Sequence, residues 1–291
     1  GDRDGNPFVT ADITRDVMNE LRLTLMKCYY NDLKGLVHKL TFKDVQEPLQ
    51  KLRGNLYTAM FDSSKDIGYE DLIGPLEEIQ SILIEKYQSL YLKDLEKFID
   101  KVKIFKVHFA TIDIRQDHSM HTKVMVEVLK KNGFINDELS ELSDEELLDI
   151  LLHKNLDLVA DDYEEDIVKD TIKNILQLQT IQAKNGEEGC NRYIISNSED
   201  KYSILFVYAL FRWCGWADKE ITFDIVPLFE TMNGMDTAQD TMKFLFSLPE
   251  YMAHLENRNK KQTIMLGFSD GTKDGGYLKA NWSILKTKEE L

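Results

Sequence analysis

Residues 192–229 read RYIISNSEDKYSILFVYALFRWCGWADKEITFDIVPLF, and the alternation of patterns within this stretch decides the fold. The segment Arg192–Ile195 is short and rich in β-branched and aromatic residues, which is typical of a β-strand. The next segment, Glu199–Cys214, has the pattern of a helix with Ser198 as its N-cap. Residues Thr222–Phe229 again predict a strand. A strand, a helix and a second strand in this order predict two parallel strands joined by a helical crossover.

The same alternation continues on both sides of this stretch. Val107–Ile114 and Thr263–Phe268 predict two further strands, and Asp236–Asn257 predicts a helix before the last of them. Strands separated by helices predict a parallel sheet, which is either doubly wound or closed into a barrel. In both architectures the ligand site lies at the carboxyl ends of the strands. The predicted fold class is therefore α/β and helix-rich.

The first hundred residues have helical patterns instead. Two series of apolar residues recur at spacings of three and four, which is the period of an amphipathic helix. The first series, with Thr10 as its expected N-cap, is Ile13, Val17, Leu21, Leu25 and Cys28. The second series is Leu72, Leu76, Ile79, Leu83, Tyr87 and Leu90. We therefore expect a helical segment over residues 1–104 and the sheet within residues 105–291.

The composition restricts the class of partner. The chain has 291 residues, with 36 Lys and Arg against 51 Asp and Glu, and a formal net charge of −15. A polyanion binds to a basic surface, so we expect no nucleic-acid partner. The longest strongly apolar stretch, Ile204–Phe211, is too short to cross a bilayer, so we expect no membrane span.

Two further features concern location and completeness. The three cysteines, Cys28, Cys190 and Cys214, are scattered and show no paired spacing, as expected of reduced thiols in the cytosol. The sequence opens with a dense turn motif, GDRDGNP at residues 1–7, without an initiator Met or a signal-peptide pattern. We therefore expect a cytoplasmic protein of which this chain is a fragment.

Charged residues follow three of the predicted strands. Arg115 follows the first strand, Glu230 follows the third, and Asp270 and Lys273 lie in a glycine-rich turn after the fourth. Glu230 and Asp270 are about one helical crossover apart, so they can lie at neighbouring strand tips and hold Mg²⁺ or Mn²⁺. Arg115 and Lys273 beside them would bind an anion, as a site for a phosphorylated substrate requires.

The same residues have structural interpretations, which the sequence leaves open. Arg115 could form a salt bridge with Asp113, the two carboxylates could be a structural acid pair, and the glycine-rich turn could be generic. His118 and His121 are three residues apart and could meet on a helix face. A surface or core role is expected of both histidines, because no third metal ligand lies close in sequence.

Four motifs taken together closely resemble phosphoenolpyruvate carboxylase. They are GDRDGNPFVT at residues 1–10, DIRQ at residues 113–116, PLFET at residues 227–231 and GFSDGTKDGG at residues 267–276. The resemblance covers the whole chain, and it implies the central piece of a chain about three times longer. It also implies a fold, which is an α/β barrel of the (β/α)8 type overlaid with helices. Residues 1–104 would then lead into a partial barrel at residues 105–291, within a single structural unit.

The resemblance implies a role for each strand-end residue. Glu230 and Asp270 match the family's divalent-metal carboxylates, so the expected cofactor is Mg²⁺ or Mn²⁺. Arg115 and Lys273 match basic residues that bind the substrate and take part in catalysis. Arg3 lies in the GDRDGNP signature near the same cleft, and we assign it a structural role first and substrate binding second.

The reaction that the resemblance implies is the formation of oxaloacetate and phosphate from phosphoenolpyruvate and bicarbonate, by a homotetrameric carboxy-lyase in the cytosol. The sequence departs from the family pattern at Asp117-His118, where Glu-Ser is common, and at Gly271, where serine is frequent. It also contains neither the His-Pro-Thr-Glu motif that carries the family's catalytic histidine nor the family's glycine- and arginine-rich loop. We therefore expect this chain alone to lack carboxylase activity.

Two other functions fit the same residues. Another metal-dependent barrel enzyme that acts on a phosphorylated or enolate substrate would keep the two carboxylates and the lysine but change the reaction. A non-catalytic helical scaffold would use the strand-end charges only as structural pairs. Metal binding that depends on Asp270 separates the scaffold from both enzymes.

Overall fold

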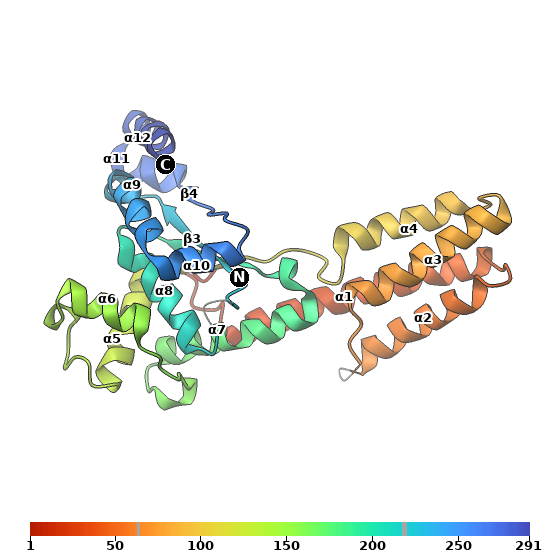
Figure 1. Cartoon of the computed structure of the whole chain (residues 1–291), viewed down its shortest axis with the longest axis horizontal. Helices are drawn as coiled ribbons and strands as arrows, with labels where there is room; N and C mark the ends of the chain where they lie inside the picture. Colours follow the sequence, from red (N-terminus) through yellow and green to blue (C-terminus); the bar gives the residue numbers. More distant parts are fainter. Residues whose placement is uncertain (63–64, 217–219) are drawn as a thin grey trace. The chain divides into compact units, whose positions relative to one another are not determined.

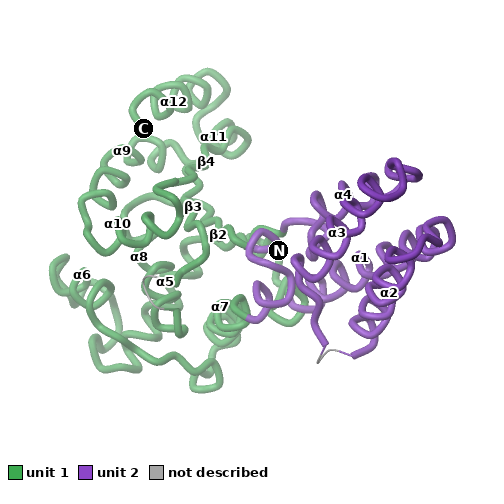
Figure 2. Tube along the Cα trace, turned by 45° about the vertical axis from the view of Figure 1, so that its right-hand side comes forward, with its two compact units in different colours: residues 1–14, 112–179, 191–291 green, residues 15–111, 180–190 purple. Residues whose placement is uncertain are grey.

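The computed structural model describes residues 1–62, 65–216 and 220–291, which form two compact units (Figure 2). The sheet unit contains residues 1–14, 112–179 and 191–291, and the helical unit contains residues 15–111 and 180–190. The first 14 residues therefore belong with the sheet and not with the helices that follow them, unlike the division that we expected at residue 104. The sequence between the two predicted helical series has a polar connection at residues 62–68, of which residues 63–64 lie outside the described residues.

The elements follow one another as Figure 1 shows. The helical unit is built from α1 (Ala11–Lys39), α2 (Gln46–Phe61), α3 (Tyr69–Tyr87) and α4 (Leu92–Phe105). The sheet unit contains β1 (Ile114–Asp117), α5 (His118–Lys131), α6 (Asp144–His153), α7 (Asp166–Asn185), β2 (Arg192–Ser196), α8 (Lys201–Trp213), β3 (Asp224–Phe229), α9 (Met232–Ser247), α10 (Pro249–Asn257), β4 (Met265–Leu266), α11 (Phe268–Gly275) and α12 (Tyr277–Glu290). Helix α1 begins in the sheet unit, and α7 ends in the helical unit.

The strands form a parallel sheet, as the alternating sequence pattern predicts. Among the described residues, four strands pair in the order β1-β2-β3-β4, with helices as the crossovers. The N-terminal segment adds a parallel bridge at the β1 edge, where Asp2 pairs with Arg115. The N–H of Arg3 donates to the carbonyl of Arg115 at 2.8 Å, and the N–H of Arg115 donates to the carbonyl of Gly1 at 3.1 Å. This arrangement is consistent with part of an α/β barrel.

Two predicted strands differ most from their sequence patterns, while the strand expected at Thr222–Phe229 only begins later, at Asp224. The strand expected at Val107–Ile114 begins only at Ile114, because the chain turns after α4 and both Lys106 and Phe109 have a positive φ, at 45° and 66°. The strand expected at Thr263–Phe268 is reduced to Met265–Leu266. Turn formation has therefore overridden β-propensity at residues 107–111.

The helical predictions need two corrections in the sheet unit. The pattern at Asp236–Asn257 is two helices, since Pro249 starts α10 and lacks the N–H that a continuous helix would need. The N-cap of α8 is Asp200, whose carboxylate accepts from the N–H groups of Tyr202 and Ser203, and not Ser198. The hydroxyl of Ser198 donates to the carbonyl of Ile195 instead.

The core of the helical unit confirms most of one predicted helix face and only part of the other. Leu72, Leu76, Ile79 and Leu83 of α3 are all buried, whereas Tyr87 is partly buried and Leu90, beyond the end of α3, is 53% exposed. In α1, however, Ile13 and Val17 are 48% and 45% exposed. The α1 side chains that enter the core of this unit are Leu25, Met26, Tyr29, Leu33, Leu36 and Val37. Each step of four residues advances about 40° around a helix, so a long run of such steps leaves the buried face.

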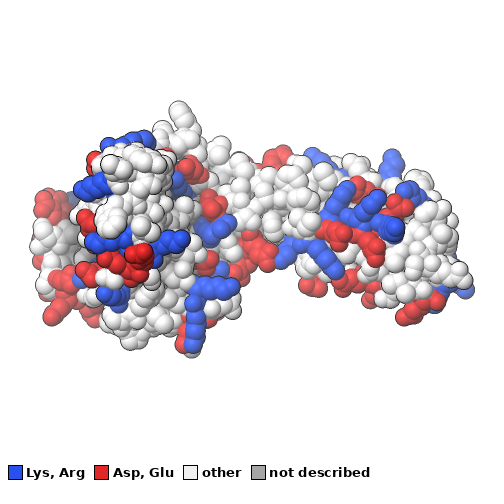
Figure 3. All heavy atoms as spheres, turned by 90° about the horizontal axis from the view of Figure 1, so that it is seen from above, with Lys and Arg blue, Asp and Glu red and all other residues white. Residues whose placement is uncertain are grey.

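Charged side chains of both signs are interspersed on the face of the molecule that Figure 3 shows. None of the helices in the described part of the chain combines the length and the apolarity that a bilayer crossing needs. In the sheet unit, α8 is buried along almost its whole length and contacts β3, α5 and α6. This helix provides the apolar support behind the strands.

Candidate active site

Arg115 connects the N-terminal segment to the end of β3. Its Nη2 donates to Asp4 Oδ2 at 2.8 Å and lies 3.8 Å from Glu230 Oε2, and its Nε lies 3.7 Å from Asp2 Oδ1. Partial burial opposes the charge of Arg115, but these three carboxylates outweigh it and raise the pKa of the guanidinium. The salt bridge with Asp113 that the sequence left open does not form, because Asp113 pairs with Arg192 at 2.8 Å.

Glu230 is a buried carboxylate at the carboxyl end of β3. Its side chain is 4% exposed, and Oε1 accepts a hydrogen bond from the backbone N–H of Asn197 at 3.0 Å. Burial raises the pKa of Glu230, and the negative charges of Asp270 and Asp4 add to the rise, while Asn197 and Arg115 oppose it. A carboxylate in this environment is short of positive charge.

Asp270 and Lys273 lie next to this carboxylate, on the helix that follows β4. Lys273 Nζ donates to Asp270 Oδ1 at 2.5 Å, and this bond lowers the pKa of Asp270 and raises that of Lys273. Both side chains are exposed, at 47% and 78%. Glu230 contributes to the pKa shifts of both residues, so the structure brings Arg115, Glu230, Asp270 and Lys273 into one charged cluster.

Gly267 permits the close approach of the β4 end to Glu230. A Cβ at Gly267 would lie 2.4 Å from the Cβ of Glu230, and the N–H of Gly267 donates to the carbonyl of Phe229 at 2.8 Å. A real Cβ never approaches another atom so closely, so only glycine fits without a shift of the backbone. The first glycine of the turn therefore has a specific packing function.

Arg3 is bonded through the backbone to Arg115 and lines a pocket that Asp4 and Asp117 also line. Its side chain is 4% exposed, its Nε donates to Gln116 Oε1 at 3.1 Å, and it pairs with Asp170. Asp170 also accepts from the N–H of Ala11 at 2.9 Å. These contacts tie the N-terminal segment to β1 and α7, and they give Arg3 the surroundings of a structural ion pair.

The two histidines His118 and His121 have separate environments. His121 is fully buried and shares a 3.0 Å hydrogen bond with the hydroxyl of Tyr193, and burial lowers its pKa to about 3. His118 is the first residue of α5 and is not fully buried. His121 is therefore a neutral core residue at pH 7, as the sequence favoured.

Sequence analysis missed several residues that contact the charged cluster, among them Asp2, whose Oδ1 lies 3.7 Å from Arg115 Nε. Asp4 binds Arg115, Asn197 binds Glu230, and Asp117 accepts from the side chain of Asn197 at 2.5 Å. The available signals were weak. An Asn directly after a strand indicates a possible left-handed turn, but it is more often only a helix cap.

The donor set fits a divalent cation. Within the described residues the cluster holds the carboxylates of Asp2, Asp4, Glu230 and Asp270 and the cations Arg115 and Lys273. Negative charge is therefore in excess, and Glu230 is buried without full compensation. Nowhere in the described part of the chain do three or more His, Cys, Asp or Glu side chains form a metal-binding group. An ion here would use two carboxylates and complete its shell with water and substrate oxygens, as Mg²⁺ commonly does.

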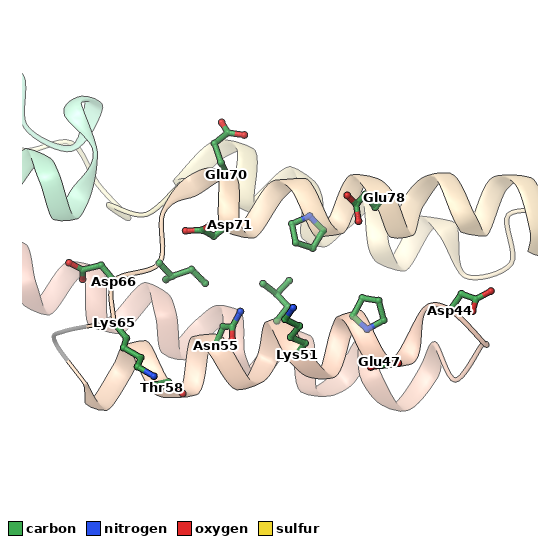
Figure 4. A pocket seen from close by; sticks show the side chains of 14 residues that line it. Asp44, Glu47, Lys51, Asn55, Thr58, Lys65, Asp66, Glu70, Asp71 and Glu78 are labelled. Atoms are coloured by element: carbon green, nitrogen blue, oxygen red, sulfur yellow. The ribbon is translucent and has the colours of Figure 1, made fainter.

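The helical unit has a separate groove between α2 and α3, with a volume of about 930 Å³ (Figure 4). Its lining includes the carboxylates of Asp44, Glu47, Asp66, Glu70, Asp71 and Glu78. All six residues are exposed to solvent. Water solvates exposed carboxylates, so this acidic lining does not require a ligand.

Fold and site together define a parallel α/β protein with a charged, partly buried cluster at the carboxyl ends of its strands. The chain belongs to the phosphoenolpyruvate carboxylase family, since the family model described as Phosphoenolpyruvate carboxylase matches residues 1–65 and 50–291. The resemblance drawn from the four motifs is thereby confirmed.

Known proteins similar to this chain carry the same description. The phosphoenolpyruvate carboxylases of Vibrio parahaemolyticus, Nitrosomonas eutropha and Vibrio atlanticus are 29%, 28% and 26% identical to it, over 322, 345 and 320 residues. Each alignment covers 100% of this chain and 36% of the relative. The chain thus spans about a third of the length of these relatives.

Gly267→Ala should destabilise the sheet unit. The added Cβ has to displace Glu230 or the β4 end, and we expect the free energy of unfolding to fall by about 1–3 kcal/mol. Urea unfolding followed by circular dichroism measures the change. Gly54→Ala is the matched control, because Gly54 lies inside α2 with no atom near its added Cβ, and alanine there should add up to about 1 kcal/mol. Equal effects of the two substitutions would contradict the packing function of Gly267.

Glu230→Gln should stabilise the protein at pH 7. The pKa of Glu230 is raised in the folded chain, so the unfolded chain loses this proton first as the pH rises, and the contribution of Glu230 to stability falls from about pH 4 upward. The glutamine carries no charge, so the gain over the wild type should be larger at pH 7 than at pH 4. Urea unfolding at both pH values, without added metal, tests this, and a pH-independent difference would show that Glu230 has an ordinary pKa.

Proposed function

We propose that this chain is the central part of an enzyme that forms oxaloacetate and phosphate from phosphoenolpyruvate and bicarbonate. The observation that carries the proposal is the charged cluster of Arg115, Glu230, Asp270 and Lys273, which joins three of the four family motifs at the ends of parallel strands. The similar proteins are described as phosphoenolpyruvate carboxylases, which supports the same reaction. An enzyme of this class would be cytoplasmic and homotetrameric.

Glu230 and Asp270 are the residues proposed to hold Mg²⁺ or Mn²⁺. Oε1 of Glu230 is occupied by the N–H of Asn197, so Oε2 is the oxygen directed to the cluster. When bound, the ion supplies positive charge for the oxygen of the enolate that is released as bicarbonate attacks the phosphate of phosphoenolpyruvate. The burial of Glu230 excludes water from one side of this position.

Arg115 and Lys273 are proposed to bind the substrate anion. Arg115 is held by Asp4 and remains charged, so its guanidinium can neutralise charge on the transferred phosphoryl group. Lys273 is 78% exposed and has a flexible stem, so it can move from Asp270 to a bound anion. Arg3 is buried against Asp170, and we give it the structural function of holding the N-terminal segment.

The chain of 291 residues alone should form no oxaloacetate. The His-Pro-Thr-Glu motif and the glycine- and arginine-rich loop of the family do not occur in its sequence, so a catalytic histidine and part of the substrate site would be missing. Coupling product formation to malate dehydrogenase and following NADH oxidation tests this expectation. Turnover above the background of a heat-inactivated sample would overturn it.

Asp270→Asn should abolish the reaction in the full-length enzyme. Loss of one of two metal carboxylates removes several kcal/mol of transition-state stabilisation, so we expect kcat/KM to fall by about 100-fold or more. The coupled assay with Mg²⁺ and bicarbonate measures it. Asp240→Asn is the control, because Asp240 is an exposed residue of α9, and the same substitution there should leave activity unchanged. An active Asp270→Asn enzyme would remove Asp270 from the metal site, and a folded but inactive wild type would leave only the family fold.

A further inference from the structure

Asn197 occupies an unusual position at the carboxyl end of β2. It directly follows Ser196, the last residue of the strand, and its backbone is left-handed, with φ at 53°. Its backbone N–H donates to Glu230 Oε1 at 3.0 Å, and its side-chain Nδ2 donates to Asp117 Oδ2 at 2.5 Å. One residue thus connects the ends of β1, β2 and β3.

Hydrogen bonds fix both Asp117, which accepts from the side chain of Asn197, and Ser198, which follows Asn197 in the chain. Asp117 is the N-cap of α5, and its Oδ1 accepts from the N–H of Ser119 at 2.8 Å. On the other side, the N–H of Ser198 donates to the carbonyl of Leu228 at 3.1 Å. The turn that carries Asn197 is therefore anchored to α5 and to β3, and its N–H has a defined direction.

Glu230 is constrained from two directions as a result. The N–H of Asn197 takes Oε1, which leaves Oε2 at 3.8 Å from Arg115. Gly267 lies against the Cβ of Glu230 from the β4 side, so the carboxylate has little room to rotate away. The side chain is oriented before any ligand arrives, which reduces the cost of binding one.

We propose that Asn197 is a positioning residue for the carboxylate of Glu230. The left-handed backbone of Asn197, in a turn anchored to β3 by the bond from the N–H of Ser198 to the carbonyl of Leu228, directs its N–H to Oε1 and so presents Oε2 for metal binding. The inference rests on the proposed function, because it treats Glu230 as a metal ligand. It adds a residue that the sequence patterns did not single out.

The residue type at position 197 follows from this geometry. A left-handed backbone is strained in most residues with a Cβ, and Asn is among the few that tolerate it. Glycine adopts it without steric cost, whereas a β-branched residue is a real outlier there. Asn197→Gly therefore keeps the direction of the N–H, and Asn197→Val does not.

The test compares Mn²⁺ affinity between these two variants in the full-length enzyme, by electron paramagnetic resonance titration of free Mn²⁺. Outer-sphere partners of metal ligands typically change affinity by 10–100-fold, so we expect the Kd of Asn197→Val to rise by about that factor. Asn197→Gly should stay within about threefold of the wild type. A purely structural role would instead make both variants differ from the wild type only in stability.

A matched control separates backbone strain from positioning. Asn259 is an exposed Asn with φ at 57°, in the turn after α10, so Asn259→Val introduces the same strain away from the site. It should lower the thermal midpoint but leave the Kd for Mn²⁺ unchanged. Circular dichroism confirms that each variant is folded at the temperature of the titration.

The outcomes distinguish the two proposals. A folded Asn197→Val enzyme with the wild-type Kd overturns the positioning role alone. Equal losses of affinity in the Gly and Val variants also overturn it, because the N–H direction would then be irrelevant. If the Glu230→Gln enzyme binds Mn²⁺ with the same Kd as the wild type, Glu230 is not a metal ligand. That result overturns the metal assignment and the positioning role with it.

Discussion

The desolvated carboxylate of Glu230 is the constraint around which the strand ends of the sheet unit are organised. Burying such a group costs several kcal/mol unless donors and cations compensate for lost water. The N–H of Asn197 and the guanidinium of Arg115 compensate in part, and the raised pKa of Glu230 shows that they do not do so fully. The metal ion that we propose would supply the missing positive charge, and without it the carboxylate lowers the stability of the folded chain.

The parallel sheet determines which charges meet Glu230. Side chains alternate between the two faces of a strand, so residues next to each other in sequence enter different environments. Arg115 pairs with Asp4 at the charged cluster. Arg3 donates to Gln116 and pairs with Asp170 of α7. The motifs GDRDGNP and DIRQ lie side by side because their backbones pair, and this pairing places Arg115 against Asp4 and Arg3 against Gln116.

The helical unit is stabilised by apolar packing, and the acidic side chains that line its groove are exposed to solvent. Its core is apolar and is built from α1, α2, α3 and α4, and its acidic side chains lie in water along the groove between α2 and α3. Exposed charges of this kind contribute little to stability and keep a strongly acidic chain soluble. At the strand ends of the sheet unit, by contrast, the low exposure of Glu230 strengthens its interactions with neighbouring charges.

Local patterns in the sequence determined the order of strands and helices, the buried face of α3 and the identity of the charged residues after β1, β3 and β4. These features depend on the spacing of hydrophobic residues and on turn-forming residues, and both can be read from residues close together in the sequence. Tertiary structure decided the start of β1, the face of α1 that is buried, and the pairing of Asp113 with Arg192 instead of Arg115. It also decided that Asn197 contacts Glu230. These outcomes depend on strand register and on packing between segments far apart in the chain, and no local spacing encodes which distant partner a side chain will meet.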